Sequence, residues 1–333
     1  MVTIKKVAEL AGVSSTTVSH IINETRPVSE ELRTRVKDAM SQLGYRPNRL
    51  ARSLRRGQTK TLGMIVPDSN NPFFAEIARG VEDASFNHGY SVILCNSEAD
   101  PEKERLYTEL LIEKQIDGLL FVAAGISGDD LVDLLQHSSV PVVVTDREIS
   151  GGNADSMGID NLAGGRMATH YLLDLDHRRI ACLGGPWNDT PSGLRVAGYQ
   201  QALAERGVAV KPELLVRGDW GCESGRQCAV ELLQLNSRPT AIFACNDMMA
   251  IGVLRGAYEL GIAVPDELSV IGFDDISLAS FVTPTLTTVN QPKYVTGIAA
   301  VDILLRRIAD RDRPTLRQEF PLELVVREST GSV

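Results

Sequence analysis

The stretch KVAELAGVSSTTVSHIINETRPVSEELRTRV, residues 6–36, decides the fold of the first part of the chain. Its apolar residues recur every three or four positions, which is the spacing of amphipathic helices. The Gly-Val-Ser sequence at 12–14 ends a first helix, Ser14 can cap a second, and Ser29 can cap a third. Three short helices, the first two joined by a tight glycine turn, predict a helix-turn-helix module.

The second predicted helix, residues 15–23, exposes small polar side chains. Its aliphatic residues face the core, which leaves Ser15, Thr16 and His20 on the outer side. A surface helix usually carries long charged residues, whereas a helix in the major groove of DNA needs side chains that reach base edges without clashing. We therefore expect these three residues to contact DNA bases. A small helical bundle without a DNA-binding role is the alternative.

The charge of the chain is divided unevenly along its length. Residues 1–60 hold 12 lysines and arginines against 5 aspartates and glutamates, which leaves 22 against 38 for the remainder. The formal net charge of all 333 residues is −9. A binder of polyanions needs local positive charge to neutralise phosphates. The distribution predicts a DNA-binding module attached to an acidic body, with a basic solvated tail as the alternative.

The segment GYRPNRLARSLRRGQTKT, residues 44–61, links the module to the body. Pro47 can begin a helix over 48–56, and Gly57 can end it. This helix is shorter than the roughly 12 to 15 residues at which isolated helices become stable, so we expect it to fold only when something holds it. Its arginines surround a small apolar face, as a wedge in the minor groove requires.

The sequences TIKKVAELAGVSSTTVSHIIN and RPNRLARSL resemble the lactose-repressor family of bacterial transcription regulators, and are nearest to its purine and ribose repressors. The resemblance implies that helix 15–23 lies in the major groove. It also implies that the hinge helices of two subunits pair in the minor groove, with Leu54 as the wedge and Arg55 beside it. The expected DNA-contacting set comprises Thr3, Ser14, Ser15, Thr16, Thr17, His20, Asn23, Arg26, Leu54 and Arg55.

From residue 61 onward, short β-rich runs alternate with amphipathic helical stretches. The runs TLGMIV, YSVILC, GLLFVA and VPVVVT are separated by helices that begin near Pro72, Pro101 and Ser127, and the pattern restarts with RRIACLGG, TAIFACN and ELSVIGFDD. Such alternation predicts βαβ units and two α/β lobes, each built on a parallel sheet. No repeat of 20 to 50 residues is evident, which argues against a solenoid.

Polar residues follow several of the predicted strands, where open α/β sheets bind their ligands. Carboxylates and arginines in similar number can bind vicinal hydroxyls without leaving net charge on a neutral ligand, and aromatic faces can cover a sugar ring. A phosphate ligand would call for a glycine-rich loop with lysine, and no such motif occurs. The set favours a neutral polyol. Single members have plainer explanations: Asp146 and Arg147 could form a structural ion pair, and Phe73 could belong to the core.

Residues 61–328 resemble the periplasmic sugar-binding protein fold that forms the core of the same repressor family. The resemblance is nearest to ribose-binding proteins, and Trp220 stands where they usually have phenylalanine. It implies a ligand set of Asn71, Phe73, Phe74, Asp146, Arg147, Arg195, Trp220, Asn246, Asp274 and Gln291. The expected domains are a headpiece at 1–46, a hinge helix and linker at 47–60, and a core at 61–333. The core is expected to comprise one lobe at about 61–160 plus 292–320 and a second at about 161–291 plus 321–330.

The resemblance further implies a mechanism. A homodimer binds palindromic double-stranded operator DNA, and a small neutral sugar, ribose or another pentose, controls it from the interlobe cleft. A purine, a hexose or a phosphorylated carrier protein as corepressor are alternatives within the family, and a sugar receptor without DNA function is one outside it. The direction of control stays open. The C-terminus lacks a leucine heptad, which favours dimers over tetramers.

The remaining features argue against other classes of protein. Five scattered cysteines within mostly apolar runs are typical of a reducing cytosol. The N-terminus has no secretory apolar region, and no run reaches the roughly 18 apolar residues of a membrane span. The five histidines show no metal-ligand spacing, and no G-x-S-x-G or H-E-x-x-H motif occurs. We expect a cytoplasmic protein that is not an enzyme and uses no metal or cofactor.

Overall fold

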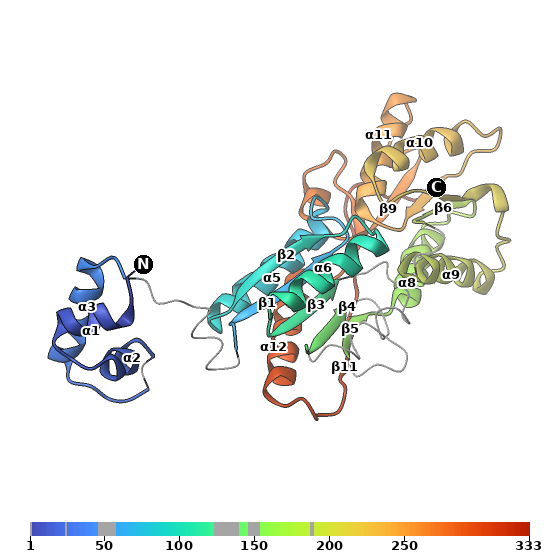
Figure 1. The fold of residues 1–333 in the computed structure, drawn as a ribbon. Helices are drawn as coiled ribbons and strands as arrows, with labels where there is room; N and C mark the ends of the chain where they lie inside the picture. The colour runs from blue at the N-terminus through green and yellow to red at the C-terminus, as the bar shows by residue number, and fades with distance from the viewer. Residues whose placement is uncertain (1, 24, 46–57, 123–139, 146–153, 187–189) are drawn as a thin grey trace. The chain divides into compact units, whose positions relative to one another are not determined.

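The computed structural model describes residues 2–23, 25–45, 58–122, 140–145, 154–186 and 190–333. The chain separates into two compact units, Met1–Thr59 and Lys60–Val333, and Figure 1 traces both along the chain. Within the described residues no helix combines the length and apolar character needed to cross a membrane. The predicted hinge helix at 48–56 and the predicted helix near Ser127 lie outside the described residues.

The first unit contains three short helices: α1 (Ile4–Ala11), α2 (Ser15–Asn23) and α3 (Glu30–Gln42). One side chain from each, Val7, Val18 and Val36, is completely buried in their shared core. Gly12 ends α1 in the left-handed region at φ 63°, a conformation that costs glycine little because it lacks a Cβ. The turn that follows brings α2 across α1, as the helix-turn-helix prediction requires.

The predicted helix caps are only partly present. Ser14 Oγ accepts a hydrogen bond from the backbone N–H of Thr17 at 3.0 Å, which is the N-capping contact expected for α2. Thr3 and Ser29 stand at the N-cap positions of α1 and α3, but neither side chain makes a capping hydrogen bond. Glu30 and Glu31 in the first turn of α3 still interact favourably with the positive end of the helix dipole.

The second unit is built on two six-stranded sheets. The first, sheet A, has the order β11-β5-β4-β3-β1-β2, and every neighbouring pair is parallel. Its strands are β1 (Thr61–Val66), β2 (Ser91–Asn96), β3 (Gly118–Val122), β4 (Val142–Thr145), β5 (Asp155–Ile159) and β11 (Arg317–Phe320). Three described helices pack on it: α5 (Pro72–Asn87), α6 (Pro101–Glu113) and α12 (Lys293–Ala309).

Alternating side chains of sheet A belong to two different core clusters. Met64 and Leu120 pack in the cluster that includes residues of α5 and α12. Their neighbours Ile65 and Leu119 pack in the cluster that includes Leu111 of α6. Both faces of this parallel sheet are therefore covered, which explains why its strands read as continuous apolar runs.

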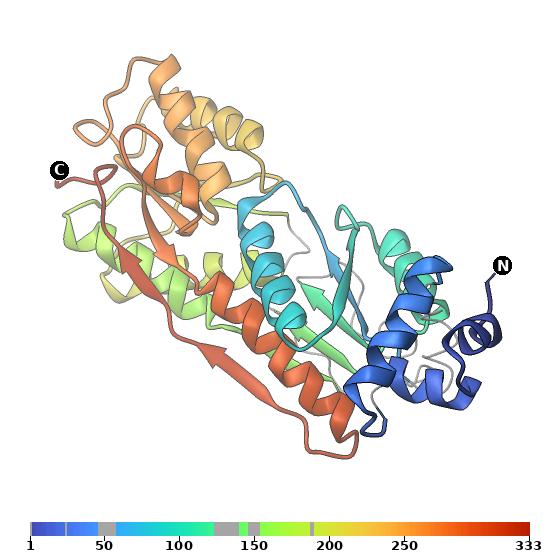
Figure 2. The same cartoon turned by 90° about the vertical axis from the view of Figure 1, so that its left-hand side faces the viewer.

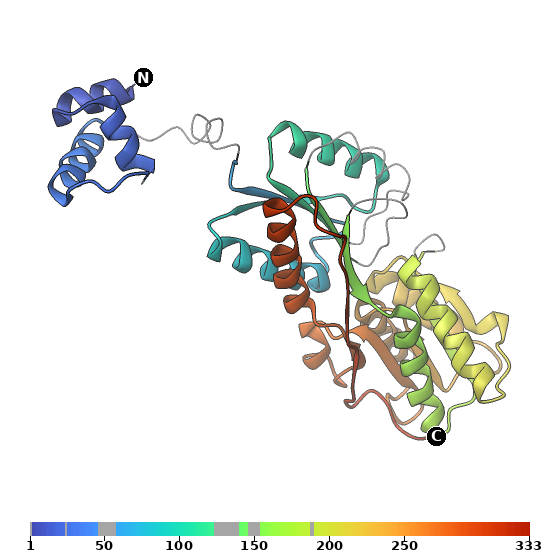
Figure 3. The same cartoon turned by 90° about the horizontal axis from the view of Figure 1, so that it is seen from below.

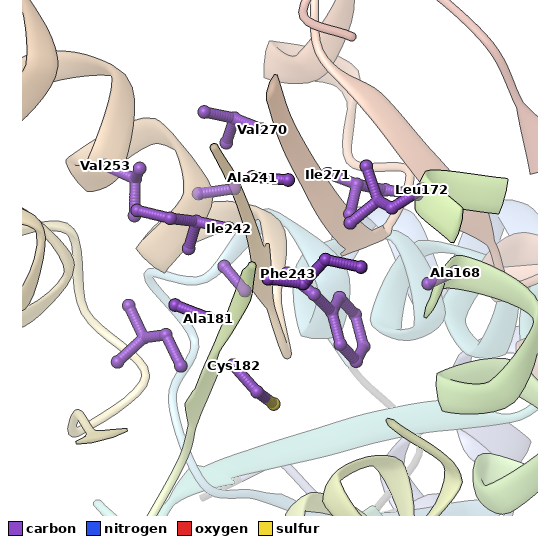
Figure 4. Packing of buried hydrophobic residues seen from close by; sticks show 14 of the residues in the cluster. Ala168, Leu172, Ala181, Cys182, Ala241, Ile242, Phe243, Val253, Val270 and Ile271 are labelled. Atoms are coloured by element: carbon purple, nitrogen blue, oxygen red, sulfur yellow. The ribbon is translucent and has the colours of Figure 1, made fainter. Parts of the chain in front are cut away.

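The second sheet, sheet B, has the order β12-β10-β9-β8-β6-β7. Its strands are β6 (Ile180–Gly184), β7 (Leu215–Arg217), β8 (Ala241–Ala244), β9 (Ser269–Asp274), β10 (Thr287–Asn290) and β12 (Glu323–Val325). The helices α8 (Asn161–Asp174), α9 (Thr190–Glu205), α10 (Cys222–Leu233) and α11 (Asp247–Glu259) belong to it, with 3₁₀ turns η1 (Pro212–Leu214) and η2 (Ser277–Ser280). Figure 4 shows Ile242 and Val253 on one side of this sheet and Phe243 with Ala168 on the other.

The chain passes between the two sheets three times: from β5 to α8, from β10 to α12, and from β11 to β12. The last passage consists of Pro321 and Leu322 alone, and Figure 2 shows the two red strands β11 and β12 following one another along the chain. In sheet B, β12 pairs antiparallel with β10. The prediction of two lobes built on parallel sheets is confirmed, and the edge strand β12 adds one antiparallel pair to sheet B.

Three neighbouring helix pairs among the described residues of the second unit touch backbone to backbone at two glycines, one from each helix. A Cβ at any of these glycines would lie only 2.0–2.3 Å from a backbone carbonyl oxygen of the partner helix, which is closer than van der Waals contact allows. The pairs are Gly80 with Gly297 in α5 and α12, Gly165 with Gly198 in α8 and α9, and Gly225 with Gly252 in α10 and α11. In Figure 3 the second pair, α8 and α9, is visible as adjacent green and yellow-green helices.

Alanine substitutions in α9 test this contact. Gly198→Ala should lower the free energy of unfolding by about 1–3 kcal/mol or more, because its methyl group meets the carbonyl oxygen of Leu162. Gly193→Ala in the same helix faces open space and should raise stability by about 0.5–1 kcal/mol. Urea titration of both variants gives the comparison, and equal effects of the two substitutions would contradict the close-contact interpretation.

Candidate functional site

A buried arginine lies at the carboxyl end of sheet B. Arg195 on α9 is 5% exposed, and its Nε donates a hydrogen bond to Asn161 Oδ1 at 2.8 Å. Its Nη1 donates to the carbonyl oxygen of Cys245 at 2.5 Å and lies 3.6 Å from Asp274 Oδ1. A buried guanidinium needs such partners, because burying an unpaired charge is costly. The contacts fix its orientation.

Two aromatic rings flank this guanidinium. The Arg195 Cζ atom lies 3.8 Å from the ring centroid of Phe273 and 5.8 Å from that of Trp220. Both distances are within the range of cation–π attraction. The geometry therefore joins an arginine, a carboxylate and flat apolar faces at one place, which is the chemistry that recognises hydroxyl-rich rings.

Asp274, the last residue of β9, is held from both its side chain and its backbone. Gln291 Nε2 donates to Asp274 Oδ1 at 2.7 Å, and Lys293 Nζ donates to the Asp274 carbonyl oxygen at 2.6 Å. Asp274 has φ 116° and Asp275 has φ 53°, a backbone region that residues with a Cβ rarely adopt. Strained backbone of this kind persists where surrounding contacts enforce it, and it is frequent at ligand sites.

Lys293, at the start of α12, makes many of the contacts that hold the backbone at Asp274 and Asp275. Its buried ammonium donates to the carbonyl oxygens of Asp274, Asp275 and Gln291 at 2.6, 2.7 and 3.2 Å. Glu76 of α5 lies 3.5 Å away and balances its charge. The three N–H groups of this one ammonium thus tie the end of β9 in sheet B to α12, which packs with α5 on sheet A.

A second buried carboxylate supports the same loop. Asp247, the first residue of α11, accepts a hydrogen bond from Thr288 Oγ1 at 2.6 Å and another from the Ile276 N–H at 2.8 Å. Burial raises the pKa of Asp247 well above its ordinary value, and the negative charge of Asp274 acts in the same direction. Asp247 therefore restrains the backbone immediately after Asp274 and Asp275.

Two of the predicted ligand residues serve as helix N-caps. Asn246 Oδ1 accepts from the Met249 N–H at 2.9 Å, while its Nδ2 donates to the Trp220 carbonyl oxygen at 3.0 Å. Asn71 Oδ1 accepts from the Phe73 N–H at 3.0 Å at the start of α5. These side-chain atoms can still meet a ligand, but their first role in this structure is to begin α11 and α5.

The structure brings only part of the predicted ligand set together. Arg195, Asp274 and Gln291 form a contiguous cluster with Trp220, and Asn246 joins it through the Trp220 carbonyl oxygen. Phe73 and Phe74 meet edge to face at 5.0 Å; Phe73 is buried in the sheet A core and lines a small pocket with Gln291 and Lys293. Asp146 and Arg147 lie outside the described residues.

The expected ligand set did not include three residues of this candidate site: Asn161, Asp247 and Lys293. Asn161 accepts from Arg195, and the other two hold the loop after β9. Asn161 and Asp247 directly follow polar residues at strand ends, a signal that was available. Lys293 gave no such signal in the sequence, because lysine side chains are usually exposed. Its burial is visible only in the folded structure.

In the first unit, the outer side of α2 presents the residues expected to contact DNA. Ser14, Ser15 and Thr16 are exposed, and His20 is half-buried. Internal hydrogen bonds engage others of the set: Ser14 Oγ and Thr17 Oγ1 lie 2.8 Å apart, and Asn23 Nδ2 donates to the Ser19 carbonyl oxygen at 2.8 Å. Thr3 precedes α1, and the exposed Arg26 lies between α2 and α3. Leu54 and Arg55 lie outside the described residues.

Substitution of the buried lysine tests its role. Lys293→Met should lower the free energy of unfolding by about 2–4 kcal/mol, because it leaves three buried carbonyl oxygens and the Glu76 carboxylate without their cation. Lys211→Met, at an exposed position, should change it by less than about 0.5 kcal/mol. Thermal and urea unfolding measure both, and a Lys293 variant as stable as the control would show that the ammonium is not required.

Comparison with known proteins assigns both units. Residues 3–48 match the family model "Bacterial regulatory proteins, lacI family", and residues 169–330 match the model "Periplasmic binding protein-like domain". The chain is 43% identical over 319 residues to the ribose operon repressor of Escherichia coli K12, covering 96% of each chain. It is 42% identical over 330 residues to the HTH-type transcriptional repressor PurR of Photobacterium profundum, covering 99% of this chain and 98% of that one.

Solved structures agree with this assignment. The lac repressor dimer bound to operator and the anti-inducer ONPF superposes with a TM-score of 0.90 at 29% identity, covering 99% of both chains. A LacI family transcriptional regulator from Enterococcus faecium with bound ribose gives a TM-score of 0.76 at 31% identity, covering 82% of this chain and 99% of that one. These relatives are transcription regulators rather than enzymes. The chain therefore belongs to the lacI family of bacterial regulatory proteins and is a transcriptional repressor.

Proposed function

We propose that this repressor binds a palindromic operator as a homodimer and that a small neutral sugar, ribose or another pentose, controls it from the core. The observation that carries the sugar proposal is the buried cluster of Arg195, Asp274 and Gln291 beside Trp220 and Phe273. Its arginine and carboxylate balance in charge, so the ligand that fits it is uncharged and rich in hydroxyls. The ribose operon repressor and the ribose-bound regulator support this choice.

The proposed division of labour follows the chain. We assign DNA reading to a headpiece at 1–46, a hinge to 47–60, and ligand binding and dimerisation to a core at 61–333. The core comprises one lobe at about 61–160 plus 292–320 and another at about 161–291 plus 321–330. The described strands of sheet A fall in the first lobe and those of sheet B in the second, which supports this assignment.

The proposed site lies where control of lobe orientation is physically simple. Asp274 ends a strand of sheet B. Lys293, which holds the Asp274 backbone, and Glu76, which pairs with Lys293, stand on the helix pair that covers sheet A. A sugar that binds Asp274 differently in two lobe arrangements would shift the balance between them, and only by that difference in affinity. We propose that ribose binding releases the operator. Coupling is reciprocal, so operator DNA should then weaken ribose binding by the same factor.

A purine is the second candidate ligand, because PurR is nearly as similar to this chain as the ribose operon repressor is. The flat faces of Phe73 and Trp220 would suit a purine ring as well as a sugar. Calorimetric titration of the purified protein with ribose, other pentoses, hexoses, hypoxanthine and a phosphorylated carrier protein separates the candidates. Saturable heat from ribose supports the proposal, and saturable heat from the purine alone contradicts it.

The role of Asp274 can be tested directly. Asp274→Asn should weaken ribose binding on the order of 100-fold, because a charge-assisted bond to a hydroxyl is replaced by a weaker one and Arg195 loses its carboxylate. Operator affinity without sugar should stay within about two-fold of the parent. The exposed Asp266→Asn serves as the control and should bind ribose normally. An unchanged ribose titration in the Asp274 variant would remove this carboxylate from the site.

The proposed wedge makes a complementary prediction. Leu54→Ala should weaken binding to a palindromic operator about ten-fold or more while leaving ribose affinity unchanged, because an apolar side chain between base steps stabilises the kinked duplex. Electrophoretic mobility shift with an operator selected from random DNA measures the first effect, and calorimetry measures the second. Equal operator affinity of the variant and the parent would refute the wedge.

A further inference from the structure

The polar side chains of α2 differ in how many of their hydrogen-bonding atoms are already engaged. Ser14 Oγ and Thr17 Oγ1 bond each other, and Asn23 Nδ2 donates to Ser19. The hydroxyls of Ser15 and Thr16 make no hydrogen bond to any described residue. His20 is intermediate: its Nδ1 lies 2.7 Å from Thr25 Oγ1, while its Nε2 has no partner among the described residues.

Thr25 is fixed to His20 at two points. Besides the contact between Thr25 Oγ1 and His20 Nδ1, the Thr25 backbone N–H donates to the His20 carbonyl oxygen at 3.2 Å. The second bond holds the threonine just beyond the C-terminus of α2, where its hydroxyl meets the imidazole ring. The ring is thereby oriented by a neighbour that lies outside the helix itself.

We propose that Thr25 is a positioning residue that fixes the orientation and the tautomer of His20, so that Nε2–H is presented as a hydrogen-bond donor to a base edge. This inference rests on the proposed role of α2 as the DNA-reading helix. In a neutral imidazole one nitrogen carries the proton and the other accepts, and the partner of one nitrogen decides the state of the other. A hydroxyl always has a proton to donate, and the described residues offer that of Thr25 one acceptor, Nδ1.

A donor at Nε2 limits which bases His20 can read. The major groove offers acceptors at N7 of adenine and guanine, O6 of guanine and O4 of thymine, whereas the amino groups of adenine and cytosine are donors. The Nε2–H of His20 can donate to one of these acceptors. Against an amino group it would be left without a hydrogen bond, which weakens binding to the wrong base. The target of His20 is therefore a base-edge acceptor, with the N7 and O6 edge of guanine offering two.

Two substitutions of Thr25 separate the effect of its hydroxyl group from the effect of its branched shape. Thr25→Val keeps the branched side chain and removes the hydroxyl, whereas Thr25→Ser keeps the hydroxyl. The full-length protein, labelled with ¹⁵N-histidine and held at pH 8, reports which ring nitrogen carries the proton through its ¹⁵N chemical shifts; His20→Gln identifies the signal. We expect the Nε2–H tautomer to predominate in the parent and the Ser variant, and a mixture in the Val variant.

DNA binding provides the functional arm. The probes are an operator that the parent protein selects from random double-stranded DNA and an unrelated duplex of the same length. Thr25→Val should bind the selected operator about five-fold more weakly, equivalent to about 1 kcal/mol, and the unrelated duplex equally well. Thr25→Ser should match the parent on both. A misfolded headpiece would instead lose affinity for both duplexes, and the Val variant would then be replaced by Thr25→Ala.

The two arms distinguish the inference from the function on which it rests. A parent protein whose His20 carries its proton on Nδ1, or a tautomer unchanged in the Val and Ala variants, would overturn the assignment to Thr25. A tautomer that changes while affinity for the selected operator stays the same would overturn the proposed contact of His20 with a base. Equal loss of affinity in the Ser and Val variants would show that the hydroxyl is not the feature that matters.

Discussion

The backbone contact of paired helices at glycine is the constraint on which the second unit depends. In each of α5 with α12, α8 with α9 and α10 with α11, two glycines let carbonyl oxygens of one helix approach the backbone of the other. The contact in α8 and α9 sits beside the site, because the Gly165 position faces the carbonyl oxygen of Arg195 itself. A wider separation of these helices would move the guanidinium away from Asn161 and Asp274, so the buried polar cluster depends on this close packing.

Burial of charge follows from the same packing. Arg195, Asp247, Asp274 and Lys293 are all at most 6% exposed, and each has hydrogen-bond partners of its own. Buried charges of this kind contribute less to stability than to the choice of one arrangement, because an alternative packing would strand them without partners. Lys293 and Asp247 hold the strained backbone at Asp274 and Asp275, and the residue that follows, by hydrogen bonds. A ligand that contacts Asp274 therefore acts on a restrained element.

Much of the fold could be predicted from local patterns, and the exceptions have physical causes. The three helices of the first unit and the strands with continuous apolar runs were predicted because their periodicity is strong. Five strands of three to five residues each were missed, because so short a pattern carries little signal: β5, β7, β10, β11 and β12. At the site, residues at strand ends were predicted because sheet topology places them together. Lys293 was not, because its burial depends on α12 reaching the end of β9, a contact between parts of the chain distant in sequence.

The three passages of the chain between the sheets have a mechanical consequence. A pair of bodies joined by one tether can separate and turn freely, and two tethers still allow a wide swing. Three short connections, at β5 to α8, β10 to α12 and β11 to β12, remove translation and leave bending and twisting of the connecting strip as the permitted motions. The two parts built on sheets A and B therefore have few degrees of freedom relative to one another. A small molecule bound near the three connections would need to select only among a few closely related rotations.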